Sequence, residues 1–106
     1  MKKTSTNVAN FKEFSVEAKN NMFSGRIYID NPKQTDKCWI WPLSLNINGL
    51  SIVGAKLWVS KDKQWISMPQ YKSGEEWKSI CFFVDKADNE DLAALANELK
   101  KLIEEK

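Results

Sequence analysis

The 106 residues suffice for one ordinary domain with a single hydrophobic core. The chain has two cysteines and no histidine, which excludes the usual zinc sets and removes the commonest general base of enzymes. The net charge is +2. Residues 1–84 carry twelve basic and seven acidic side chains, whereas residues 85–106 carry four basic and seven acidic ones. A basic body followed by an acidic end mildly indicates a polyanion as partner. No apolar run is long enough to cross a membrane and the polar start lacks a signal peptide's apolar stretch, so we expect a cytoplasmic protein.

The first part of the chain is expected to contain a tail and a hairpin. Residues 1–10 are polar and unpatterned, which predicts a disordered N-terminal tail before a single domain at residues 11–106. Apolar and polar side chains alternate over residues 14–18 and again over residues 23–29. This alternation predicts two strands joined by a turn at residues 20–21.

The clearest predicted strand covers residues 38–47, where alternate side chains are apolar. Trp39 and Trp41 share the phase of these apolar side chains, so we expect both indoles in the core. Pro42 has no backbone N–H to donate to a neighbouring strand. It therefore predicts a sheet edge or a bulge at this position.

The turn after this strand carries the strongest local signal in the sequence. Asn48 and Gly49 both tolerate a positive φ, as a type I′ hairpin turn requires. Such a turn pairs Ile47 with Leu50 and puts their apolar side chains on one face. The apolar phase then slips by one residue, which predicts a bulge near Gly54.

A second hairpin is expected to follow, with residues 60–63 as its loop. This loop length pairs Trp58 with Trp65 on the face opposite the apolar side chains. Residues 71–77 are rich in turn-forming side chains and are predicted to be a loop. Residues 78–84 are predicted to form the last strand.

The chain is expected to end in a helix with Asp88 as its N-cap. Its apolar side chains lie on one stripe that must pack on the sheet or on a partner helix. The stripe residues assigned to helix packing or dimer contact are Leu92, Leu95, Leu99 and Leu102. The predicted fold class is therefore α+β: a strongly curved antiparallel sheet of four to six strands, built as a meander of hairpins, followed by one C-terminal helix.

The open face of this sheet is predicted to gather aromatic and basic side chains, and the loop after it adds more. Aromatic rings stack on the bases of single-stranded nucleic acid, and cations follow its phosphates. The candidate nucleic-acid-binding residues are Arg26, Tyr28, Lys56, Trp58, Trp65, Tyr71, Lys72, Trp77 and Lys78. Two other interpretations stay open: Trp58 and Trp65 form a cross-strand pair that only stabilises the hairpin, or a second subunit buries them.

No catalytic or metal-binding pattern is found among the remaining candidates. The acidic side chains at Glu75, Glu76 and around the helix start match no known metal-ligand spacing, and we interpret them as solvated or capping groups. Cys81 has apolar neighbours and no histidine partner, so both it and Cys38 are interpreted as small buried thiols. We therefore expect no enzyme activity, no metal and no cofactor.

The stretch at residues 45–84 resembles the stage V sporulation protein G family, also called septation protein G. The likeness rests on the Asn-Gly hairpin, on the segments WISMPQYK and GEEWKSI, and on the closing helix. The resemblance implies a small dimer that binds DNA and RNA and regulates expression. The chain has Phe82-Phe83 where the family has His-Pro, so no role of that histidine can be carried over. The order of elements also resembles, at the level of fold, Whirly-type and coactivator-type single-stranded DNA-binding domains.

These features together predict a homodimer that binds single-stranded DNA or RNA through the aromatic and basic sheet face. The alternative is a non-enzymatic regulator that docks the same face on a protein partner. An exposed sheet edge at residues 38–42 and the long apolar helix stripe favour pairing of two copies.

Overall fold

The computed structural model describes residues 10–104, so the tail expected at residues 1–10 lies, apart from Asn10, outside the described residues. Its large antiparallel sheet has six strands: β1 (Phe11–Glu17), β2 (Met22–Tyr28), β3 (Lys33–Gln34), β4 (Cys38–Ile47), β5 (Leu50–Ser60) and β6 (Gln64–Ser67). The path runs β1-β2-β4-β5-β6, and the short β3 pairs with β4. A separate hairpin, β7 (Gln70–Ser73) and β8 (Glu76–Ser79), precedes α1 (Lys86–Glu104). The predicted α+β class, an antiparallel sheet followed by one C-terminal helix, is confirmed.

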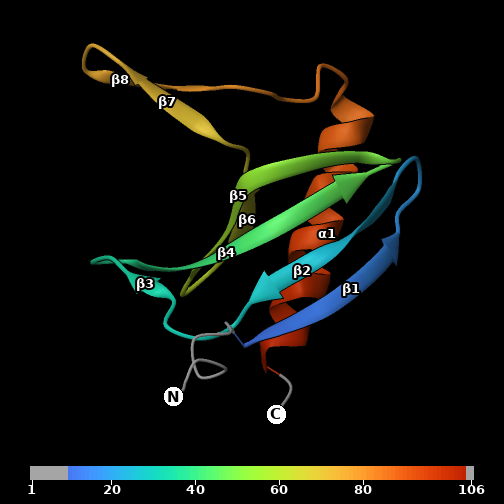
Figure 1. Cartoon of the computed structure of the whole chain (residues 1–106), viewed down its shortest axis with the longest axis horizontal. Helices are drawn as coiled ribbons and strands as arrows, with labels where there is room; N and C mark the ends of the chain where they lie inside the picture. The colour runs from blue at the N-terminus through green and yellow to red at the C-terminus, as the bar shows by residue number, and fades with distance from the viewer. Residues whose placement is uncertain (1–9, 105–106) are drawn as a thin grey trace, which may run out of the picture.

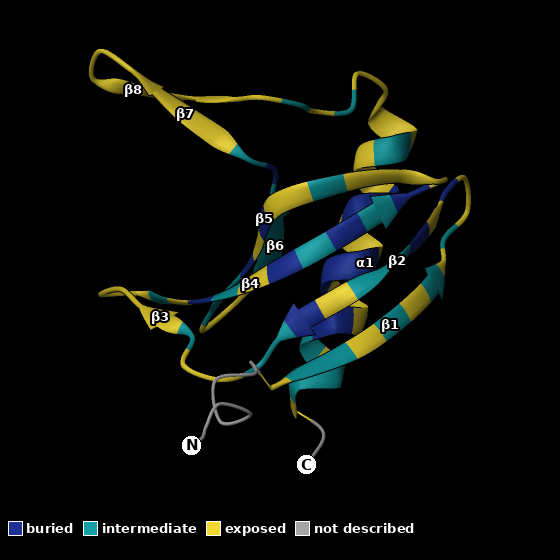
Figure 2. Cartoon of the chain, viewed as in Figure 1, coloured by how far each residue is buried: buried dark blue, intermediate teal, exposed yellow. Residues whose placement is uncertain are grey.

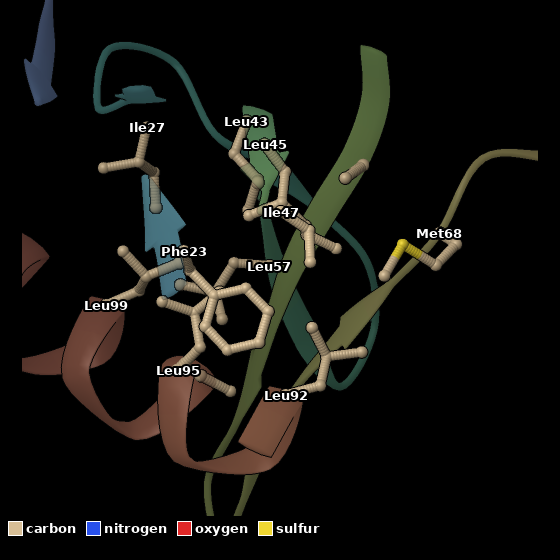
Figure 3. Close-up of a cluster of buried hydrophobic side chains, with 12 residues drawn as sticks. Phe23, Ile27, Leu43, Leu45, Ile47, Leu57, Met68, Leu92, Leu95 and Leu99 are labelled. Carbon is tan, nitrogen blue, oxygen red and sulfur yellow. The ribbon is translucent and has the colours of Figure 1, made fainter. Parts of the chain in front are cut away.

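The helix covers one face of the large sheet and leaves the other face without a covering layer (Figure 1). Leu95 and Leu99 of α1 are fully buried against Phe23 and Ile27 of β2 and Leu57 of β5 (Figure 3). Burying such a side chain contributes roughly 1.5–3 kcal/mol to folding. The helix stripe therefore packs on the chain's own sheet. In Figure 2 the buried positions alternate with partly buried ones along the second half of β4, as expected for a strand of a sheet with one covered face.

The turn chemistry of the β4–β5 hairpin is confirmed in detail. Asn48 and Gly49 have φ values of 50° and 91°, and Ile47 pairs with Leu50. The register shifts further along the same pair of strands, where Gly54 has a φ of 99° and no partner residue on β4. This is the predicted bulge.

The turn between β1 and β2 is attached to the start of the helix by a buried carboxylate. Asp91 is only 4% exposed and accepts hydrogen bonds from the backbone N–H of Asn20 at 2.7 Å and from the side-chain amide of Asn21 at 2.9 Å. The Asn48 amide in turn donates to Asn21 Oδ1 at 2.9 Å. Two turns of the sheet and the first turns of α1 thus share one polar network.

Two predicted elements differ from the structure. The prediction of a strand at residues 78–84 is wrong, because β8 ends at Ser79. This short strand pairs with β7 in the region that was expected to be a loop. The helix begins at Lys86, two residues before the predicted cap, so Asp88 lies within its first turn.

Within the described part of the chain, no helix is long and apolar enough to cross a membrane.

Trp39 also differs from its prediction. It is 43% exposed, although it lies on the same side of β4 as the partly buried Trp41, whose ring centroid is 6.4 Å away. Trp41 packs against the core and Trp39 does not belong to it. The apolar alternation of β4 predicted the correct face, but the core ends before it reaches Trp39.

Pro42 lies where neither β2 nor β3 pairs with β4, which explains how the sheet accommodates a residue without an N–H.

Candidate nucleic-acid interface

The strand register places the five sheet candidates on the face that the helix leaves open. Along β5, Leu57 is fully buried on the helix side, so its neighbours Lys56 and Trp58 point to the other side. Trp65 lies directly opposite Trp58 on β6 and shares its face. By the same alternation around the buried Ile27, the side chains on the open face of β2 are those of Arg26 and Tyr28.

The two indoles on β5 and the edge strand β6 are stacked. The ring centroids of Trp58 and Trp65 are 5.7 Å apart and the ring planes differ by 12°. Trp58 Nε1 donates a 2.8 Å hydrogen bond to Ser67 Oγ, which fixes the orientation of the ring. Both rings are partly buried, so each keeps some surface in contact with solvent. Beside them Ile40, opposite Trp58 on β4, is only 6% exposed, and it is buried outside the helix-side core.

Lysines that the sequence pattern did not single out lie beside the two indoles. Lys63 Nζ is 5.3 Å from the centroid of the Trp65 ring, within the range of a cation–π contact. A hollow beside Trp65 is also lined by Lys37, Lys61 and Lys63, together with Asp36 and Asp62. The lysines come from two loops that precede β4 and β6, and the sheet brings them together. In the sequence, each loop carries a lysine two residues before a tryptophan, Lys37 before Trp39 and Lys63 before Trp65.

The β7–β8 hairpin divides the remaining candidates between two faces. Trp77 pairs with Lys72, and Tyr71 pairs with Lys78, so each pair shares one side of the hairpin. Trp77, which is 64% exposed, lines a hollow of about 260 Å³ together with Lys56 and Trp58. The side with Trp77 and Lys72 therefore adjoins the open face of the sheet, and the side with Tyr71 and Lys78 points away from it. Figure 1 shows the hairpin standing off the sheet.

A second aromatic group lies at the other end of the open face. The rings of Phe11 and Tyr28 meet edge to face with centroids 5.9 Å apart, and the Arg26 guanidinium lies 4.7 Å above the Phe11 ring. Arg26 and Tyr28 are thus brought together as expected, but by way of Phe11. No residue before Arg26 was predicted to be functional, so Phe11 was missed.

The other candidates lie away from the open face. Of the helix stripe, Leu92, Leu95 and Leu99 are buried in the chain's own core and Leu102 is partly buried, so these side chains do not form a free surface for a partner helix. The cysteines are free and partly buried. Between residues 10 and 104, no group of three or more acidic or cysteine side chains is arranged to hold a metal ion.

Comparison of the chain with models of protein families, with curated proteins and with solved structures found no match.

Proposed function

We propose that the chain binds single-stranded nucleic acid, DNA or RNA, on the open face of its sheet, and that it does so as a homodimer. The observation that carries the proposal is the stacked pair of Trp58 and Trp65 between Lys56 and Lys63. Indole rings stack on bases of any sequence, and neighbouring ammonium groups neutralise phosphates. A ring contributes roughly 1–3 kcal/mol per stacked base, so two or three rings with their cations support micromolar affinity.

The distribution of charge and rings supports an extended ligand. Lys37, Lys61 and Lys63 line one end of the indole pair, while Lys56 and Trp77 line the other. A flexible single strand can follow such a path, because successive bases reach successive rings and its phosphates pass the lysines. The resemblance to the stage V sporulation protein G family points to the same class of ligand.

The dimer is proposed from the exposure of the β7–β8 hairpin. All eight residues of its two strands are exposed, and the segment that follows carries Ile80, Phe82 and Val84 at 63%, 70% and 87% exposure. An isolated two-stranded hairpin is marginally stable in water. Contact with a second copy would cover Ile80, Phe82 and Val84 and give the hairpin a layer to pack against. The helix stripe, buried on its own sheet, no longer supports pairing.

A regulator that docks the open face of the sheet on a protein is the second candidate, and the exposed indole of Trp77 beside this face favours it. Tyr and Trp are enriched where proteins bind proteins. The two candidates differ in their dependence on salt, since phosphate contacts make log K fall linearly with log salt concentration.

Titration with oligo-dT, followed by tryptophan fluorescence at two salt concentrations, tests the proposal. We expect strong quenching at low salt and an affinity that falls as salt is raised. Absence of quenching at about 100 μM oligonucleotide and low salt, where micromolar binding would saturate, would remove nucleic-acid binding and leave the protein-docking candidate.

A further inference from the structure

The open face carries a row of small polar side chains that the stacked indoles do not use. Ser24 of β2 pairs with Asn46 of β4, and Asn46 pairs with Ser51 of β5. One step along, Arg26 pairs with Ser44. Directly opposite residues of antiparallel strands share a face with their Cβ atoms about 5 Å apart. These five side chains therefore form a continuous polar patch.

This patch is hollowed. These five residues line a depression of about 400 Å³, which we name the polar hollow, and the rest of its lining is Glu13, Phe14, Gly25 and Tyr28. That volume lies within the roughly 300–1,000 Å³ of pockets that hold small molecules. Part of its floor is the backbone at Gly25, which approaches β4 so closely that a Cβ would lie 1.9 Å from the carbonyl oxygen of Ser44.

Three polar side chains in the hollow have no hydrogen-bond partner within residues 10–104. The side chains of Ser24, Ser44 and Asn46 are partly buried, yet none of them is hydrogen-bonded to another described residue. The amides of Asn21 and Asn48, in contrast, are both engaged by neighbours. A partly buried amide with free donors and acceptors can bind the edge of a ligand that presents both.

We propose that the polar hollow binds the edge of one nucleobase of the bound strand and gives the protein a preference between bases; this inference rests on the proposed function. An amide offers a donor and an acceptor side by side, and base edges present the same complementary pattern. The Arg26–Phe11–Tyr28 cluster borders the hollow and supplies a ring and a cation for the same nucleotide.

The hollow also lies on the path of the strand. Ser44 is four residues along β4 from Ile40, which pairs with Trp58, so about 13 Å separate the hollow from the indole pair at 3.3 Å per residue. Sites of roughly 4–16 nucleotides are usual for sheets that bind single strands. One strand can therefore stack on Trp58 and reach the hollow.

The test compares the affinities of oligo-dA, oligo-dC and oligo-dT of equal length for the wild type, Asn46→Ala and Ser44→Ala. For the wild type we expect a spread of about tenfold or more between the strongest and weakest ligand, and in Asn46→Ala a spread below about threefold. Ser73→Ala, an exposed serine on β7 outside the hollow, is the matched control and should keep the wild-type spread.

The outcomes separate the inference from the proposed function. Equal affinities of the wild type for all three oligonucleotides, or an unchanged spread in Asn46→Ala, would overturn base recognition in the hollow while leaving nucleic-acid binding in place. Lack of binding by any of the three would overturn the proposed function itself. Trp58→Leu should weaken all three by a similar factor and leave their ratios unchanged, because stacking tolerates any base.

Discussion

Asn21 donates a 2.9 Å hydrogen bond to the buried carboxylate of Asp91, which lies 70 residues further along the chain. The backbone N–H of Asn20 donates to the same oxygen. Because Asn21 also accepts from Asn48, the contact ties the β1–β2 and β4–β5 turns to the helix. The network thus fixes the first turns of α1 to these two turns, while the buried Leu95 and Leu99 pack the helix on the sheet.

Replacing Asp91 by Ala should lower the free energy of unfolding by about 3 kcal/mol. The substitution leaves the Asn20 N–H without its acceptor and removes one of the two carboxylates to which the Asn21 amide donates, the other being that of Asp88. Hydrogen bonds to a charged group are worth roughly 1.5–3 kcal/mol each. Urea denaturation followed by circular dichroism measures the change. Glu90→Ala, at an exposed neighbouring position, is the control and should cost less than about 1 kcal/mol, the range of a helix-dipole contribution. Equal losses in the two variants would show that the network does not stabilise the fold.

Gly25→Ala should be severely destabilising, by more than about 3 kcal/mol, because the new methyl group would collide with the Ser44 carbonyl oxygen and the backbone has a φ of 146°. Gly74→Ala is the matched control. It also has a positive φ, 65°, but nothing lies within 4 Å of its Cβ, so only a conformational cost of about 1–2 kcal/mol is expected. Thermal or urea unfolding of both proteins measures the difference. Similar losses would mean that β2 does not approach β4 this closely.

The elements predicted correctly are those whose signals are local. Asn48-Gly49 determines the turn and the register on either side of it, and Gly54 marks the bulge. The loop at residues 60–63 likewise determines that Trp58 faces Trp65. Each of these positions is decided by backbone conformation within a few residues, so a single sequence contains the information.

The features that were missed depend on distant parts of the chain. Asp91 is buried only because the β1–β2 turn supplies its donors, and no nearby residue indicates this. The β7–β8 hairpin buries neither of its faces, so its strands lack the alternation that reveals a strand. The lysine cluster beside Trp65 forms only when the loops before β4 and β6 meet.

The lysines beside Trp65 should determine part of the salt dependence of binding. Replacing both Lys61 and Lys63 by Gln removes two candidate phosphate contacts, so the slope of log K against log salt concentration should become shallower by about 1.4. Anisotropy of a labelled oligonucleotide at four or more salt concentrations gives the slope. Lys100→Gln with Lys101→Gln removes the same charge from the helix and should leave the slope within error of the wild type. An unchanged slope in the first variant would place the phosphates elsewhere.

The hairpin flank should be required for dimer formation. Light scattering after gel filtration is expected to give twice the 12.2 kDa mass of the chain. Phe82→Asp, which puts a charge on an exposed apolar position of the flank, should shift the protein to the monomer mass. Ala93→Asp on the exposed side of the helix carries the same charge change and should remain dimeric. A wild-type protein that is monomeric at 100 μM, a concentration well above typical dimer dissociation constants of about 1 μM or less, contradicts the dimer.

Trp65→Leu tests the central claim most directly, with Trp39→Leu as its matched control. Trp39 is an exposed tryptophan on the helix side of the same sheet, so both variants lose one indole from the surface. Both should remain folded by circular dichroism, and the measurement is the affinity for a labelled oligo-dT at low salt. We predict that Trp65→Leu weakens binding about fivefold to 150-fold, the loss of one stacked base, while Trp39→Leu stays within about twofold. Equal affinities of the two folded variants would contradict binding on the open face of the sheet.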